Sequence, residues 1–193
     1  VKLILRAGAD PSIELIERNP NSTNHIDYNF AREIGGEIWA AVEEADKKFQ
    51  VTRAAKSGQG KTIIALLQQG VVADAVDRYG YTAVQQAAGF NIPDAVKALI
   101  DGGADPNRLR PDGKTPLTHA AAEGVAANIP VLVAGGADPN AFDGKGSTPL
   151  TCAIFNNDGA AGAVVQALVD AKADPNLQDK QGEYPLAFAA RME

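Results

Sequence analysis

Short segments of this 193-residue chain recur at a fixed interval, and this repetition limits the fold more than any other feature of the sequence. The residues GADPN occur at 103–107 and again 33 positions later, at 136–140. A related copy, KADPN at 172–176, follows after 36 positions, and we place its three extra residues in an enlarged turn at 157–162. Repetition at this interval predicts a stack of similar units that share one continuous core.

Apolar residues in each unit keep the same register. They occur seven, four and three positions before the first residue of GADPN or its equivalent, and this spacing places them on one face of an α-helix. The sets are Ile63, Leu66 and Leu67; Val96, Leu99 and Ile100; Ile129, Leu132 and Val133; and Val165, Leu168 and Val169, with Val1, Ile4 and Leu5 fitting the same rule. We therefore expect one helix per unit with this face buried.

The residues TPL, at 115–117 and 148–150, predict the start of a second, shorter helix. Threonine is a favoured N-cap residue and proline suits the first helical position. Alanine pairs in this helix, such as Ala87 with Ala88, allow neighbouring helices to approach closely. In the unit at 113–145 the long helix is expected to start about one turn late, because Pro130 would be costly inside it.

The period, the TPL start and the GADPN end together resemble the ankyrin repeat family. The resemblance implies one mainly α domain over residues 1–193, an ankyrin-repeat solenoid of stacked helix-turn-helix pairs with β-hairpin-like fingers on one side. Full repeats would occupy 47–79, 80–112, 113–145 and 146–181, with partial repeats at 1–12 and 182–193. The family's histidine is replaced here by Gln85, Thr118, Thr151 and Ala187, so we expect its hydrogen bonds to be missing or only partly replaced by hydroxyl groups.

Residues 13–48 do not follow the repeat and are interpreted as an insertion or cap, with a helix near 37–48. The favoured role of this helix is to cover the first repeat, since a solenoid needs its ends covered. The alternative is a partner-binding excursion with Trp39 as an anchor. Because the chain starts inside one repeat and stops inside another, we expect it to be a segment of a longer array or of a multidomain protein.

Composition and charge exclude several classes of function. The net charge of −6 gives no general attraction to nucleic acid or to anionic membranes. One cysteine, Cys152, and two histidines cannot form a disulfide or a four-ligand zinc site, so no metal or other cofactor is expected and the thiol is interpreted as buried and inert. We expect a soluble monomer, with an intracellular location favoured over the bacterial periplasm.

The stretch AAKSGQGKTIIALL, residues 54–67, contains a loose phosphate-loop pattern at 55–62. That pattern binds nucleotides only when a buried strand enters the loop and a helix leaves it. The repeat register instead aligns the loop with the turn between two antiparallel helices, and Lys61 is expected to point into water. Nucleotide binding is therefore a remote alternative. No nucleophile is specified near His25 or His119, and we interpret the chain as non-catalytic.

The resemblance implies protein binding through the finger tips and the concave face of the first helices. The matching positions of this sequence are Arg78, Tyr79, Tyr81, Phe90, Leu109, Asp112, Lys114, Glu123, Phe142, Lys145 and Phe155. Packing between neighbouring fingers is an alternative role for Leu109 and Phe142. A basic rim of Arg78, Arg108, Arg110 and Lys114 suits a protein partner with an acidic patch. Two further roles stay open: an inhibitor or self-protection protein that occludes a partner enzyme, and the targeting arm of a larger enzyme or effector.

Overall fold

The computed structural model describes residues 36–155 and 161–190, with side chains from residue 46 onward except that of Phe188. Several expectations lie outside the described residues: the partial repeat at 1–12, the insertion up to residue 35, the turn at 157–160 and the side chain of Trp39.

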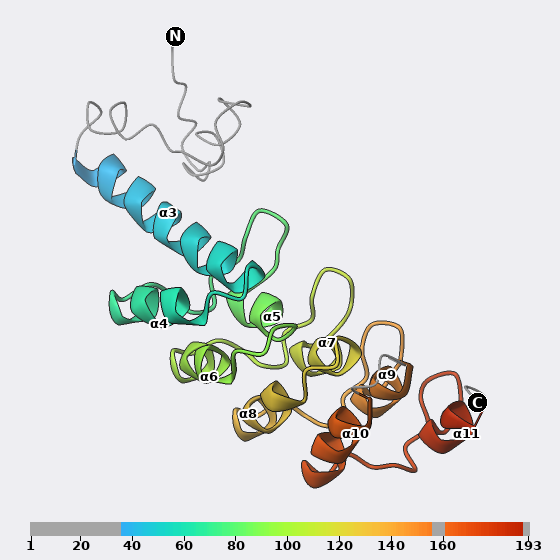
Figure 1. The fold of residues 1–193 in the computed structure, drawn as a ribbon. Helices are drawn as coiled ribbons and strands as arrows, with labels where there is room; N and C mark the ends of the chain where they lie inside the picture. The colour runs from blue at the N-terminus through green and yellow to red at the C-terminus, as the bar shows by residue number, and fades with distance from the viewer. Residues whose placement is uncertain (1–35, 156–160, 191–193) are drawn as a thin grey trace.

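The helices of the described part form two parallel rows (Figure 1). The first row contains α3 (Gly36–Lys56), α5 (Ala83–Ala87), α7 (Pro116–Ala122), α9 (Pro149–Phe155) and α11 (Pro185–Ala189), and the second contains α4 (Gly60–Gln68), α6 (Pro93–Asp101), α8 (Ile129–Ala134) and α10 (Ala161–Asp170). Each helix packs against its neighbour in its own row. A helix of the first row also forms an antiparallel pair with the helix of the second row that follows it in the chain. This arrangement is the predicted solenoid of helix-turn-helix units.

The helix expected near 37–48 and the first helix of the following repeat are one continuous helix. This helix, α3, is 21 residues long, and its last residues pack against α4 and α5. Val51 and Ala55 in this part are fully buried. The sequence has no glycine or proline between the two segments, which is consistent with one helix. The continuity was missed because the boundary was inferred from the repeat register alone.

The predicted apolar faces are buried in three repeats. Side chains seven and four positions before the loop are buried at Ile63 and Leu66, Val96 and Leu99, and Ile129 and Leu132, while the third member of each set is partly buried. The third position faces the next repeat: Ile100 lies against Gly135, where an added Cβ would come within 2.7 Å of it. Each second helix therefore packs in two directions, toward its own repeat and toward the next.

The prediction for the last set was partly wrong. In α10 the fully buried residues are Val164 and Leu168, whereas Val165 is partly buried and Val169 is 42% exposed. Val169 occupies the position through which Ile100 contacts the next second helix. In the described part no second helix follows α10, so this side of α10 has no neighbour.

Reciprocal hydrogen bonds start the first helices, as the TPL pattern predicts. The Thr115 hydroxyl accepts from the Thr118 N–H at 3.0 Å, and the Thr118 hydroxyl accepts from the Thr115 N–H at 2.8 Å. Thr148 and Thr151 form the same pair. The expectation that Gln85 loses the family histidine's bonds was wrong: its Oε1 accepts from the Thr82 N–H at 2.8 Å, and its Nε2 donates to the Arg108 carbonyl at 2.8 Å. A glutamine is long enough to span both groups, while threonine serves only the cap.

The late start of the long helix in the third repeat is confirmed. A 3₁₀ turn, η1 (Ala126–Asn128), replaces the first α-helical turn, and α8 begins at Ile129 with Pro130 in its first turn. The turn also gives Asn128 a structural role, because this residue is fully buried. Its Nδ2 donates to the carbonyls of Ala88 at 2.9 Å and Phe90 at 2.6 Å. The Ala88 carbonyl lies at the C-terminal end of α5, where the helix itself supplies no donor.

Asn128→Ala should therefore lower the free energy of unfolding by about 1–3 kcal/mol, because it removes the donor of the buried Ala88 carbonyl in the preceding repeat. Asn91, which is exposed, provides the matched control. Asn91→Ala should change stability by less than about 0.5 kcal/mol. Urea unfolding of the three proteins measures both changes, and equal stability of Asn128→Ala and the unchanged chain would contradict the role given to Asn128.

Candidate partner-binding surface

Four loops project on the same side of the solenoid, each between a second helix and the next first helix (Figure 1). We call residues 76–82, 109–115, 142–148 and 178–184 fingers 1 to 4. In fingers 1, 3 and 4 an aspartate closes the turn: the carboxylate of Asp77 accepts from the N–H groups of Tyr79 and Tyr81 at 2.8 and 3.0 Å. Asp143 and Asp179 make the same pair of bonds. Gly80 follows with φ of 83°, a left-handed conformation that favours glycine.

Finger 2 is built differently, because Arg110 stands where the other fingers have aspartate. Its guanidinium donates to the Gln85 carbonyl at 2.9 Å, donates to the Asp112 carboxylate at 3.2 Å and lies 5.0 Å from the centre of the Tyr81 ring. The side chain is only 10% exposed. Arg110 therefore joins two repeats, and Tyr81 and Asp112, both predicted as partner contacts, are engaged within the protein.

The charges around Asp112 stabilise its ionised form. Burial raises its pKa, but the Lys114 N–H and the charges of Arg110 and Lys114 outweigh that effect, so the pKa lies below its usual value. Asp112 is thus a carboxylate tied to its own finger at neutral pH.

Direct bonds connect fingers 2, 3 and 4. The Gly144 N–H donates to the Gly113 carbonyl at 2.7 Å, and the Lys180 N–H donates to the Gly146 carbonyl at 2.9 Å. Below the fingers, Asn107 donates to the Gly136 carbonyl at 2.8 Å. Asp105, Asp138 and Asp174 accept from amides of their own turns, as predicted. The fingers are held to one another as well as to their own repeats.

Large apolar side chains along this surface are exposed. The exposed fractions are 58% for Tyr79, 39% for Phe90, 53% for Leu109, 36% for Phe142 and 64% for Phe155. Two of these residues also pack within the protein: Phe90 covers the turn at Gly58, and Lys180 lies 5.7 Å from the centre of the Phe142 ring. Tyr81 is partly buried, and Arg78, Glu123 and Lys145 are exposed. The tertiary structure therefore places most of the predicted contact residues at the surface.

A family model for ankyrin repeats matches three copies over residues 87–179. The match covers the helices from α6 to α10 and fingers 2 and 3. Residues 87–179 of this chain are therefore ankyrin repeats. Ankyrin repeats are generally protein–protein interaction modules and are typically non-catalytic. A search of curated proteins gave no match.

Within the ankyrin stack, His119 lies between two first helices. Its Nδ1 is 3.7 Å from the Glu123 carboxylate, and a Cβ added to Gly89 would come within 2.7 Å of its Nε2. The side chain is 13% exposed. Burial, followed by the charges of Arg110 and Lys114, lowers its pKa to about 4, so the ring is neutral near pH 7. Its position one residue after the family histidine makes it a packing residue between repeats.

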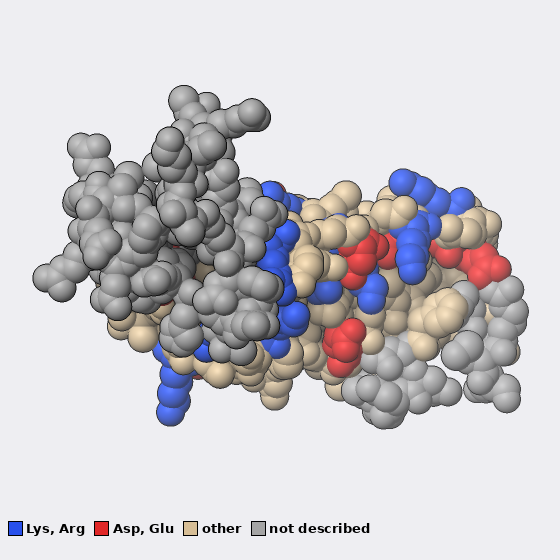
Figure 2. Space-filling view, turned by 90° about the horizontal axis from the view of Figure 1, so that it is seen from above, with Lys and Arg blue, Asp and Glu red and all other residues tan. Residues whose placement is uncertain are grey.

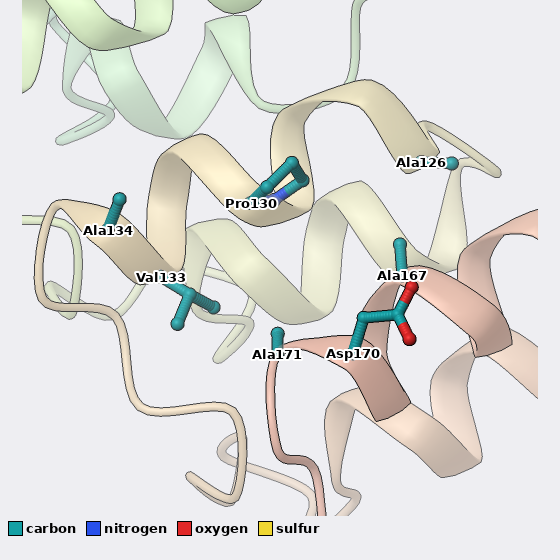
Figure 3. Close-up of a pocket in the computed structure, with 7 residues that line it drawn as sticks. All are labelled: Ala126, Pro130, Val133, Ala134, Ala167, Asp170 and Ala171. Atoms are coloured by element: carbon teal, nitrogen blue, oxygen red, sulfur yellow. The ribbon is translucent and has the colours of Figure 1, made fainter.

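The second helices bear a shallow groove between α8 and α10 (Figure 3). It encloses about 430 Å³ and is lined by Ala126, Pro130, Val133, Ala134, Ala167, Asp170 and Ala171. A second groove of about 290 Å³ lies on the other side of α8, beside Ile100 and Gly135. Small residues of α8 create both grooves. Asp170 is the ionisable side chain in the lining of the first groove, and Lys97 and Asp101 in the lining of the second form an exposed ion pair of 2.7 Å.

Sequence reasoning missed two exposed apolar residues at the C-terminal end, Tyr184 at 47% and Leu186 at 78%. Leu186 matches Leu117 and Leu150, which are 1% and 3% exposed. In the described part no second helix follows α11, so no helix of that kind covers Leu186.

The structure also shows where the phosphate-loop pattern and Cys152 lie. The phosphate-loop pattern lies between α3 and α4, a helix enters it instead of a strand, and Lys61 is exposed. Burial and the Asp143 charge raise the pKa of the Cys152 thiol to about 12, which makes it a poor nucleophile. Within residues 36–155 and 161–190 no three His, Cys, Asp or Glu side chains gather as a metal site. None of the helices in the same part is long and apolar enough to cross a membrane.

Mg²⁺-ATP should leave the unfolding temperature unchanged, because the loop at 55–62 lacks the strand that a phosphate loop requires. A ligand that binds only the folded state and is present at a concentration of 100 times its Kd would add about 2.7 kcal/mol to the free energy of unfolding. Thermal unfolding with and without the nucleotide measures this. A rise that disappears in Lys61→Ala would contradict the expectation.

His119 should make stability depend on pH. Its pKa is lower in the folded protein, about 4, than the usual 6.5, so the unfolded chain takes up the proton first as the pH falls. The contribution of His119 to the free energy of unfolding is fully present above pH 6.5. It should fall by about 2–3 kcal/mol when the pH is lowered to 4.5. His119→Gln should lose correspondingly less between pH 7 and pH 4.5. Urea unfolding of both proteins at the two pH values measures the difference, and identical losses would contradict the assignment.

Proposed function

We propose that this chain is a non-catalytic protein-recognition module that binds its partner through the finger tips and the exposed side of the first helices. The contact residues are Arg78, Tyr79, Leu109, Lys114, Glu123, Phe142, Lys145, Phe90 and Phe155, with Tyr81 and Asp112 supporting the fingers. The observation that carries this proposal is the exposure of Tyr79, Phe90 and Phe155, which ranges from 39% to 64%.

Exposed aromatic residues favour a contact role for physical reasons. Removing a large apolar side chain from water contributes about 1.5–3 kcal/mol, and aromatic residues often contribute most of the binding energy of an interface. The three residues belong to finger 1, to the end of α5 and to the end of α9, so they extend over several repeats. A partner that covers them would contact the solenoid along its length.

The rigidity of the surface supports the same role. Fingers 2 to 4 are joined by backbone hydrogen bonds of 2.7 and 2.9 Å, and Arg110 ties finger 2 to the preceding repeat. A surface held in its binding conformation loses little entropy on association. The structure therefore favours recognition by preformed contacts over folding on binding.

An affinity capture experiment tests the proposal. The triple variant Tyr79→Ala/Phe90→Ala/Phe155→Ala should recover partner proteins at about a tenth of the level of the unchanged chain or less, because two or more hot-spot residues are lost. The matched control is Val72→Ala/Val169→Ala, which removes side chains that are 50% and 42% exposed but lie outside the fingers and first helices. Thermal unfolding checks that each variant folds. Equal recovery by all three proteins would refute this surface.

A further inference from the structure

We propose that the fingers recognise an extended acidic segment of the partner, with an acidic side chain at about every third residue. This inference rests on the protein-binding role proposed above and names the chemistry of the bound segment. It is carried by one cation in each finger, by the engagement of the finger carboxylates, and by the spacing of the fingers.

Each finger presents a basic side chain near its tip: Arg78, Lys114, Lys145 and Lys180 in fingers 1 to 4. Arg78, Lys145 and Lys180 are exposed and Lys114 is partly exposed. Within the described residues, none of the four forms an ion pair with a carboxylate. Seen from the finger side, Lys and Arg side chains lie over the middle and the right-hand end of the molecule, with acidic side chains among them (Figure 2). This row is notable on a chain whose net charge is −6.

Four of the five carboxylates in the fingers are less available to a partner than these cations. Asp77, Asp143 and Asp179 each accept two backbone N–H groups of their own turn. Asp112 is bound by Arg110 and by the Lys114 N–H. Hydrogen bonds from amides and a guanidinium offset part of the negative charge of these groups. The basic side chains are therefore freer than these carboxylates to contact a partner.

Two of the cations lie against aromatic rings. Arg78 is 4.7 Å from the centre of the Tyr79 ring, and Lys180 is 5.7 Å from the centre of the Phe142 ring. Such contacts restrict the position of the cation and leave an apolar face beside it. A segment with an apolar residue next to each acidic residue would use both features.

The spacing of the fingers sets the spacing of the acids. Neighbouring repeats pack through helices, whose axes lie about 8–10 Å apart. In an extended chain with the polyproline II conformation, three residues make one turn and span about 9 Å, so acids at every third residue lie on one face and would meet successive fingers. The row has one cation per finger, which suits a single extended chain better than a helix about 10–12 Å wide.

Fluorescence anisotropy with synthetic peptides tests the proposal. The probe, which we call the alternating peptide, is a labelled peptide of about 12 residues made of four copies of Glu-Leu-Ser, so that glutamate recurs at every third residue. It reaches about 40 Å when extended. The control peptide has the same composition with its glutamates in one block. At low salt the alternating peptide should bind about 10-fold more tightly than the block peptide, and binding should weaken as salt is added.

Charge-reversal variants of the protein provide the second half of the test. Lys145→Glu/Lys180→Glu should weaken binding of the alternating peptide by about 10-fold or more, since two attractive pairs become repulsive. The matched control, Lys61→Glu/Lys97→Glu, makes the same change of net charge on the exposed side of α4 and α6 and should alter binding by less than about 2-fold. If the double variant does not fold, Lys145→Glu alone serves, because Lys145 contacts no ring.

Several results would overturn the proposal: no detectable binding, equal binding of the two peptides, equal loss in both charge variants, or tighter binding of an alanine-rich helical peptide with glutamate at every seventh residue. Tighter binding of an oligothymidylate of the same length would reassign the row to nucleic acid. If the aromatic triple variant loses captured partners while Lys145→Glu/Lys180→Glu keeps them, the acidic segment is refuted and the proposed function stands. If both variants keep them, both proposals fail.

Discussion

The close approach of neighbouring first helices is the constraint on which the rest of the structure depends. Alanines at their contacts are fully buried, namely Ala55, Ala87, Ala88, Ala120, Ala121 and Ala153. Larger side chains at these positions would force the repeats apart, because a packed core does not absorb added volume. Separation would also break the bonds between fingers, such as the one from Gly144 to Gly113. The spacing of the whole binding surface is therefore set by small residues in the core.

Within this frame, structural and recognition roles fall on different residues of each finger. Aspartates such as Asp143 hold the turn through their own amides, and left-handed glycines such as Gly80 allow it. Exposed finger positions such as those of Tyr79 and Lys145 present aromatic and basic side chains instead. Finger 2 departs from this division, because Arg110 is turned inward to join two repeats. Its charge contributes to stability more than to recognition.

Much of the fold could be predicted from the sequence, because the repeat makes each residue comparable with its counterparts. The register placed Leu99 and Leu132 in the core and Thr115 at a helix start, and Pro130 indicated the late helix. Gln85 was misjudged, since its partner at Arg108 lies 23 residues away, just before the next finger. Exposure of Tyr79 was predictable from its place in a turn, whereas the packing of Phe90 on Gly58 depends on contact between repeats.

The sequence by itself determined the repeat, the positions of the helices and the identity of the finger residues, because these follow from local spacing and from capping preferences. Only the tertiary structure decided which of those residues are engaged within the protein. Arg110, Asp112 and Lys114 look alike as charged finger residues, yet only the fold buries the first and ties the second to it. The physical reason is that the position of Arg110 is set between repeats, by its bond to the Gln85 carbonyl 25 residues earlier, and the linear sequence does not bring these two residues together.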